Sequence, residues 1–514
     1  MPNTIMTKCG EIRGTTCQWD GVVAYKGIRY ATAGRWEYPE IVTHWDGIYE
    51  ADKYGNCSYQ PRAFYNEEEV VEKAFYYNEF RKGETYTYDD DCLFLNIWVP
   101  ETATPVSKLP VIFYIHGGGY TGGCGHEKHF DGPVWPTKGV IAVTCNYRLG
   151  PMGYLCLPEL EKEAGHTGNY GMFDQITALQ WVKNNIEAFG GNPENITLMG
   201  QSAGAMSTLN LCISPLTDGL FAKAVMNSGG GVHKLMDSKA TTKDRFEFWQ
   251  KVMEELNIST VKELREMEVS KVFAAWQKLK KTSQKYGMVA SPCIDGIALT
   301  KSGLAIAEKG GQKNIPYMMG STSQDIVPPI VHGMAKNWCI MQAEQKKQPS
   351  YCWYFDRKLP GDDNGAWHSS ELWYFFGTLK NGWRPFTEHD YKISEAMVNA
   401  LCNFECVQRC NIFSESDLFT TNIKIIFHPK SIKLSHDPSH DMISCFFVLF
   451  RKFDRILCTD VIDVFKRIKN TITFFQRICC INTIFFRVVD SHDSLRTVSG
   501  EISTQTSNPV EIVK

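Results

Sequence analysis

Between residues 110 and 355, short apolar runs typical of buried strands alternate with longer stretches of helical periodicity. The strand-like runs cover residues 110–115, 139–145, 196–199, 224–226, 315–319 and 351–355. Apolar positions recur at threefold and fourfold spacing over residues 175–189, and Gly190 ends that pattern. A second helical stretch begins at Ala203. This alternation predicts an α/β fold with a mostly parallel central sheet and helices on both faces.

One charge-rich segment interrupts the alternation. Residues 234–310 have helical patterning and contain no strand-like run, which returns only at residue 315. We therefore expect this segment to form an inserted helical cap over the sheet.

The composition changes near residue 400. Every Ala, Trp and Tyr and 40 of the 41 Gly residues precede residue 401. A native domain uses Ala and Gly at near-average frequency. We divide the chain into a domain over residues 1–404 and an atypical tail over residues 405–514. A non-native reading frame is the favoured explanation of the tail, and a specialised helical appendage is the alternative.

The charge balance gives no sign of a polyanionic partner. The chain has 54 basic and 57 acidic residues, a net charge of −3, and no block of five or six like charges. No apolar run approaches the roughly 20 residues of a membrane helix, and residues 1–14 lack the apolar core of a signal peptide. We expect a cytoplasmic protein with a small-molecule partner, no nucleic-acid or membrane partner, and an undetermined oligomeric state.

Cysteine and histidine residues do not form a recognisable metal motif. The 18 cysteines include no CxxC pair, which excludes a zinc ribbon and a thioredoxin-type site, and we expect most of them to be buried thiols. His126 and His129 lie in a glycine-rich loop, where solvated histidines are the favoured interpretation over metal ligands. No metal or cofactor is expected.

The run Gly200-Gln201-Ser202-Ala203-Gly204 follows a predicted strand and opens a predicted helix. In this context a GxSxG pattern indicates a nucleophile elbow, in which Ser202 occupies a strained turn and the small flanking residues let strand and helix pass closely. The alternative is a glycine-rich turn whose serine only caps the helix.

A second motif, His116-Gly117-Gly118-Gly119, directly follows the strand-like run over residues 110–115. Acyl transfer needs backbone N–H groups that point at a developing oxyanion. We assign that oxyanion-hole role to Gly118 and Gly119, with the third N–H from Ala203. A phosphate-binding loop is the competing interpretation, but the chain has no GxxxxGK[ST].

These motifs, together with three further runs, resemble the type-B carboxylesterases, the α/β-hydrolase family that includes the cholinesterases. The further runs are DCLFLN at 91–96, NYRLG at 146–150 and GNYG at 168–171. The resemblance extends from about residue 9 to residue 404. It implies an α/β-hydrolase fold and a Ser-acid-His triad in that chain order.

By the same resemblance, Asp325 takes the place of the triad acid, which is usually Glu in this family, and His368 that of the base. A loop aspartate that caps a turn and a surface-loop histidine are the respective alternatives. The acid would hold the imidazole in the correct tautomer, and the base would accept the serine proton.

Two positions depart from the family, and one family disulfide position is matched. Gln201 stands where many relatives have Glu, and Lys82 stands where cholinesterases have a tryptophan that binds quaternary ammonium. Cys57 and Cys92 match a family disulfide position, but we expect them to be reduced in a chain with no export signal.

The resulting hypothesis is a serine carboxylesterase for small, uncharged and partly apolar esters that works through an acyl-enzyme on Ser202. The alternatives are a catalytically silent adhesion or scaffold homologue on the same fold, and an inactive truncated product.

Overall fold

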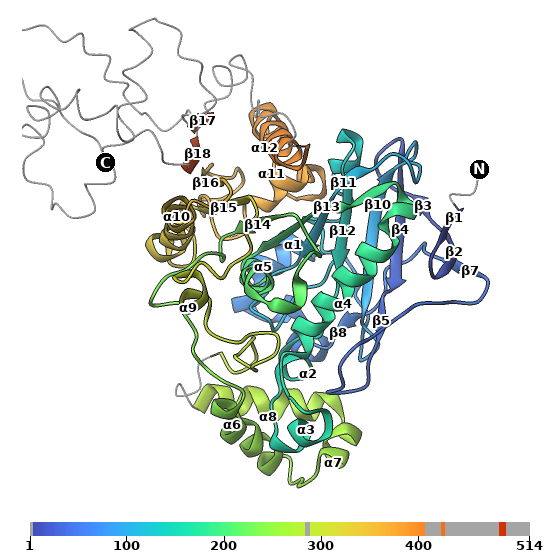
Figure 1. The fold of residues 1–514 in the computed structure, drawn as a ribbon, viewed down its shortest axis with the longest axis vertical. Coiled ribbons are helices and arrows are strands. Elements are labelled where there is room, and N and C mark those ends of the chain that lie inside the picture. The colour runs from blue at the N-terminus through green and yellow to red at the C-terminus, as the bar shows by residue number, and fades with distance from the viewer. Residues whose placement is uncertain (1–3, 283–287, 407–422, 427–482, 490–514) are drawn as a thin grey trace, which may run out of the picture.

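The computed structural model describes residues 4–282, 288–406, 423–426 and 483–489 (Figure 1). An eleven-stranded sheet crosses the molecule in the order β17-β18-β16-β15-β14-β13-β11-β12-β10-β4-β3. Its central strands are parallel: β11 (Leu109–Ile115), β12 (Ile141–Cys145), β13 (Gly191–Gln201), β14 (Lys223–Asn227), β15 (Tyr317–Thr322) and β16 (Ser350–Asp356). Each of the six strand-like runs overlaps one of these strands, so the prediction of a mostly parallel sheet is confirmed.

One edge of the sheet is antiparallel and was not predicted from the sequence. It consists of β10 (Phe94–Pro100), β4 (Val22–Arg29) and β3 (Thr15–Thr16). The pairing of β4 with β10 shifts at Gly27, whose N–H donates to Asn96 Oδ1 at 2.9 Å. Such a bulge breaks the regular alternation that identifies a strand in the sequence.

At the opposite edge, β18 (Thr483–Val489) pairs in parallel with β16, and β17 (Ile423–Ile426) pairs antiparallel with β18. These two strands are the only parts of residues 407–514 that the structure describes. The rest of the predicted tail lies outside the described residues.

Smaller elements lie in the part of the chain before β10. They are β1 (Thr4–Thr7), β2 (Gly10–Arg13), β5 (Ala31–Thr32), β6 (Glu40–Ile41), β7 (Ile48–Glu50), β8 (Cys57–Ser58), α1 (Ala74–Phe80) and β9 (Tyr88–Asp89). Strands β1, β2 and β7 form a separate three-stranded sheet, and β8 pairs with β9.

Alternate side chains of each central strand enter two different cores. On β11, Val111, Phe113 and Ile115 lie in one core, whereas Ile112 and Tyr114 lie in the other. Helices α4 (Tyr170–Asn185), α5 (Ala203–Ile213) and α10 (Pro328–Glu344) cover the first face, and α11 (Leu372–Phe376) and α12 (Glu388–Cys406) cover the second. Because every face of a parallel sheet must be covered, its strands are apolar throughout.

A third core belongs to the segment inserted between β14 and β15. Helices α6 (Lys243–Glu255), α7 (Val261–Glu266) and α8 (Val269–Thr282) gather at one end of the molecule with α3 (Pro158–Ala164), at the bottom of Figure 1. Trp249 and Trp276 pack there against Tyr154 of α2 (Gly150–Tyr154). The short helix α9 (Gly303–Ala307) completes the segment. These helices fall within the range in which the sequence predicted a cap.

The residue chosen as the end of the first domain lies inside a helix. Helix α12 continues past Phe404 to Cys406, and Glu405 is fully buried. The backbone carbonyl of Glu405 accepts hydrogen bonds from Lys223 Nζ at 2.6 Å and from Asn195 Nδ2 at 3.1 Å. Among the helices that the structure describes, none has both the length and the apolar character required to cross a membrane.

Candidate active site

The predicted site residues meet where neighbouring parallel strands end. The loop with Gly118 follows β11, Ser202 follows β13, Asp325 follows β15, and His368 follows β16. In open α/β sheets the carboxyl ends of parallel strands form the usual ligand-binding edge. Segments far apart in the chain therefore reach one place.

Ser202 lies on a strained strand-to-helix turn. Its backbone angles are φ 56° and ψ −125°, and its N–H donates to the carbonyl of Asn227 at 2.8 Å. A Cβ atom at Gly204 would overlap the carbonyl of Ile115, and one at Gly200 would overlap the carbonyl of Gly204. Both glycines are therefore required by the close passage of β13 and α5.

The hydroxyl of Ser202 does not cap α5. Ser202 occupies the N-cap position but makes no side-chain capping bond to this helix. Its Oγ lies 2.9 Å from Nε2 of His368 instead. The alternative in which the serine serves only as a helix cap is therefore wrong.

His368 joins Ser202 to a buried carboxylate. Its Nδ1 lies 2.6 Å from Oδ1 of Asp325, and the two residues are 8% and 6% exposed. With its proton on Nδ1, the imidazole donates to Asp325 and presents the Nε2 lone pair to the serine hydroxyl. His368 is thus not a surface-loop histidine.

The environment of Asp325 favours its ionised form. Burial alone would raise the pKa of this carboxyl, but the hydrogen bond and charge of His368 outweigh it and lower the pKa from its ordinary value. The Ser228 hydroxyl and the backbone N–H of Ile326, at 2.8 Å, act in the same direction. Asp325 is therefore ready to stabilise an imidazolium.

A second carboxyl group, Glu371, lies behind the triad and was missed by the sequence analysis. It is fully buried, and burial together with the charge of Asp325 raises its pKa to about 8. Ser228, with φ 53°, interacts with both carboxyl groups. Only the position of Glu371, three residues after His368, could have drawn attention to it in the sequence.

The residue before the nucleophile also faces the imidazole. Nε2 of Gln201 lies 3.3 Å from Nε2 of His368, and Gln201 is 3% exposed. Gln201 is an uncharged amide, so it brings a polar group to the histidine without a second negative charge.

The glycine loop after β11 lies against the serine. A Cβ atom at Gly117 would approach the Cβ of Ser202 to 3.0 Å, and Gly118 and Gly119 have φ of 103° and 62°. The carbonyl of Gly118 accepts the N–H groups of Thr121 and Gly122 at 3.1 and 3.0 Å, which holds the loop in a tight turn. Positive φ explains why glycine is needed at both positions.

The structure overturns the prediction that two loop histidines are solvated. His126 and His129 are only 9% and 3% exposed. His129 stacks on Phe80 with ring centroids 3.7 Å apart, and His126 stacks on Tyr54 at 4.5 Å. Glycine content suggested an open loop, but the aromatic side chains of distant segments cover it.

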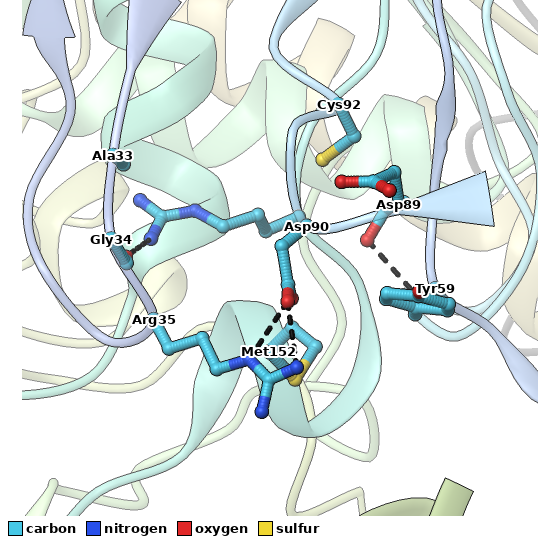
Figure 2. A pocket seen from close by; sticks show the side chains of 10 residues that line it. Ala33, Gly34, Arg35, Tyr59, Asp89, Asp90, Cys92 and Met152 are labelled. Carbon is cyan, nitrogen blue, oxygen red and sulfur yellow. Dashed lines mark hydrogen bonds and ion pairs between the residues drawn. The ribbon is translucent and has the colours of Figure 1, made fainter. Parts of the chain in front are cut away.

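A hollow in the structure lies apart from the triad. Figure 2 shows Arg35 directed at Asp90 and Cys92 on the same wall. Nε of Arg35 bonds to Oδ2 of Asp90 at 2.8 Å. None of Ser202, Asp325 and His368 lines this hollow, so we assign the ion pair a structural role.

A large, mostly parallel sheet that carries a serine elbow, an imidazole and a carboxylate at its carboxyl edge defines the α/β-hydrolase class. The model of the carboxylesterase family matches residues 1–338. The chain belongs to the carboxylesterase family.

Individual relatives agree with this assignment. The para-nitrobenzyl esterase of Bacillus subtilis (strain 168) is 32% identical over 328 residues, 62% of this chain and 62% of that protein. The bile salt-activated lipase of Bos taurus is 39% identical over 222 residues, 41% of this chain and 34% of that protein. The chain thus spans less than two thirds of the curated relatives it matches.

Solved structures share the fold. A PNB esterase superposes with a TM-score of 0.69 at 25% identity, over 81% of this chain and 92% of that one. A carboxylesterase of Geobacillus stearothermophilus superposes with a TM-score of 0.65 at 26% identity, over 80% of this chain and 93% of the other.

Proposed function

We propose that this chain is a serine carboxylesterase. The observation that carries the proposal is the continuous hydrogen-bonded series from Ser202 through His368 to Asp325, at 2.9 and 2.6 Å. Such a series activates a hydroxyl that is a poor nucleophile on its own. It also argues against a catalytically silent homologue, which has no need of an intact triad.

The reaction has two halves. Ser202 attacks the ester carbonyl while His368 accepts its proton and then passes it to the departing alcohol, which leaves an acyl group on Ser202. Water, deprotonated by His368, releases the acid. Asp325 orients the imidazole and stabilises its charged form, and the N–H groups of Gly118, Gly119 and Ala203 bind the oxyanion.

The expected substrates are small, uncharged and partly apolar esters. Gln201 adds no charge beside the serine, and Glu371 with its pKa of about 8 is mostly neutral at pH 7. Asp325 is already paired with His368. These three side chains give a substrate cation little negative charge to bind.

Covalent labelling tests the nucleophile. A fluorophosphonate should label the wild-type chain, and Ser202→Ala should abolish both labelling and hydrolysis of 4-nitrophenyl esters of graded acyl length. The matched control is Ser207→Ala, a buried hydroxyl in α5 that bonds to Gln175 at 3.1 Å and should leave labelling intact. Persistent labelling of the Ser202→Ala protein would show that another residue is the nucleophile.

A matched substrate pair tests the charge preference. Butyrylcholine and its uncharged 3,3-dimethylbutyl analogue have nearly the same shape and differ by one positive charge. The neutral ester should have the higher kcat/KM. A preference for the choline ester would contradict the proposed substrate class while leaving the nucleophile assignment intact.

A further inference from the structure

A second group of reactive side chains lies in the segment that follows the oxyanion loop. Cys57 is in β8, and Cys124 and His126 come shortly after Gly119 in the chain. One ligand atom from each of the three lies within 4.8 Å of the other two, and Cys57 Sγ is 3.8 Å from Nε2 of His126. The residues are 0%, 1% and 9% exposed. We call this group the Cys2His cluster.

The spacing of the Cys2His cluster suits a metal ion. Zinc bonds of about 2.3 Å to sulfur and about 2.0 Å to nitrogen place tetrahedral ligand atoms about 3.6 Å apart. The observed 3.8 Å between Cys57 Sγ and His126 Nε2 is close to that value. Within the described ranges, no other group of three or more His, Cys, Asp or Glu side chains meets the same criterion.

The imidazole is held in place before any ion arrives. The ring of His126 lies parallel to that of Tyr54, with an interplanar angle of 6°, and the Tyr54 hydroxyl donates to Asp131. Stacking of this kind fixes the direction of the ring nitrogens. A preorganised ligand loses less conformational entropy on binding.

A positive charge lies beside the Cys2His cluster. Nη2 of Arg62 is 3.9 Å from the Cys124 sulfur, and a nearby cation favours the thiolate. Thiolate, not thiol, is the form that binds metals.

We propose that Cys57, Cys124 and His126 bind a thiophilic metal cation, with Zn²⁺ as the best match. Two thiolates and a neutral imidazole balance the charge of Zn²⁺. With Cu⁺ the same ligands would carry a net charge of about −1, and an uncompensated charge in a buried site is unfavourable. On binding, the two thiols release their protons to solvent, the imidazole coordinates in its neutral form, and no oxidation occurs. A water molecule that accompanies the ion takes the fourth position.

The bound ion would hold the segment that follows the glycine loop against β8. Gly123, next to Cys124, already donates its N–H to Gln60 Oε1 at 2.9 Å, and Gly125 donates to Asn146 Oδ1 at 2.7 Å. Cys124 lies between these two glycines, so a metal bond at its sulfur would add a third and stronger link at the same place. The cation would therefore stabilise the loop and stay away from the reacting atoms.

Disulfide formation is the competing use of Cys57. The family resemblance pairs Cys57 with Cys92, but Cys92 lies in the hollow beside Asp90, outside the Cys2His cluster (Figure 2). In the structure Cys57, Cys92 and Cys124 are all free thiols. A disulfide between Cys57 and Cys124 would not account for the position of His126 beside both sulfur atoms.

Metal analysis of the full chain tests the proposal. The protein is purified with a thiol reductant, stripped with a chelator and reloaded with Zn²⁺ or, anaerobically, with Cu⁺. We expect one zinc ion per chain and a higher Tm, because a ligand that binds only the folded state stabilises it. Binding of Cu⁺ with exclusion of Zn²⁺ would overturn the charge argument and the choice of metal.

Substitutions identify the ligands. Cys57→Ser and Cys124→Ser should each lose the zinc ion, and Cys92→Ser, which removes a buried thiol outside the Cys2His cluster, should retain it. Retention of zinc by both cluster variants would overturn the proposal.

Cobalt substitution gives a readout that needs no variant. Co²⁺ in the wild-type site should show thiolate-to-metal charge-transfer absorption in the near ultraviolet. The absence of this absorption, or a reduced and stripped chain that binds no zinc, would contradict the proposal. Metal content and absorption do not depend on esterase activity, so this test is independent of the proposed function.

Discussion

The loops after β15 and β16 each carry a buried carboxyl group close to His368, and the two groups behave oppositely. Asp325 bonds directly to the imidazole, so its pKa falls despite burial. Glu371 has no such partner, and burial with the negative charge of Asp325 raises its pKa to about 8. Burial alone therefore does not determine whether a carboxyl group is charged. The nearest group that compensates its charge does.

Because Asp325 and Glu371 lie close together, only one of the two carries a negative charge. Two ionised carboxylates in a shared buried place repel each other, and the cheaper solution is that one retains its proton. The Ser228 hydroxyl lies beside both groups and lowers the pKa of each, but it does not offset the burial of Glu371. Three substitutions test this description.

The largest effect is expected at Asp325. Asp325→Asn should lower kcat by about 10⁴ because the amide favours the wrong imidazole tautomer. The matched control is Glu371→Gln, which keeps a neutral group neutral and should lower kcat less than tenfold at pH 7. Steady-state kinetics on one 4-nitrophenyl ester measures both.

Equal losses in the two variants would contradict the division of roles. A loss under tenfold in Asp325→Asn would require another acid near His368. Besides Glu371, the acids on the same loop are Asp362 and Asp363, but they pair with Arg384 at 2.6 Å and Lys358 at 3.0 Å.

A smaller effect, on stability, is expected at Glu371. Its folded-state pKa of about 8 exceeds the ordinary value of 4.5, so the protonated form favours folding. Its contribution is complete below about 4.5 and is lost as the pH rises to about 8, with a slope of up to about 1.4 kcal/mol per pH unit.

Urea unfolding at pH 5 and pH 8 checks this. Glu371→Gln cannot ionise, so its free energy of unfolding should fall less between the two pH values than that of the wild type. Glu388→Gln, at an exposed position on α12 paired with Lys392, is the control and should follow the wild type. An identical pH dependence for wild type and Glu371→Gln would show that Glu371 is ionised throughout.

The smallest effect is expected at Ser228. Ser228→Ala removes a hydroxyl that favours the ionised form of Asp325, although its Oγ makes no hydrogen bond of normal geometry, so kcat/KM should fall by less than about tenfold. Ser321→Ala, whose hydroxyl faces His332 at 3.3 Å, is the control and should leave kcat/KM unchanged.

An unchanged kcat/KM in Ser228→Ala would mean that the hydroxyl does not hold Asp325 in its charged form. In that case His368 and the backbone N–H of Ile326 would account for the low pKa by themselves.

Local patterns were sufficient for some features and failed for others. The parallel strands were predicted because they are continuous apolar runs, whereas β4 was missed because its bulge at Gly27 breaks the pattern. The histidines at 126 and 129 were placed in solvent because their loop is rich in glycine, and they are buried because Tyr54 and Phe80 cover them. Contacts between distant segments leave no local signal.

Neighbouring residues alone were enough to predict the serine elbow and the glycine loop. Ser202 needs a strand, a tight turn and a helix in direct succession, and Gly118 and Gly119 need positive φ, so each requirement is met by neighbouring residues. Asp325 and His368 were proposed from family resemblance and chain order. Their hydrogen bond forms only because β15 and β16 are adjacent strands that end at the same edge of the sheet.

The charge of Glu371 and the proximity of Cys57 to Cys124 and His126 depend on the tertiary structure. A pKa depends on the distance to other charges and to water, and a ligand set depends on atoms within a few ångströms. Neither quantity is a property of neighbouring residues. They arise when β8, the glycine loop after β11 and the loops after β14, β15 and β16 pack together, and for that reason the sequence assigned no metal to Cys57 and Cys124 and no role to Glu371.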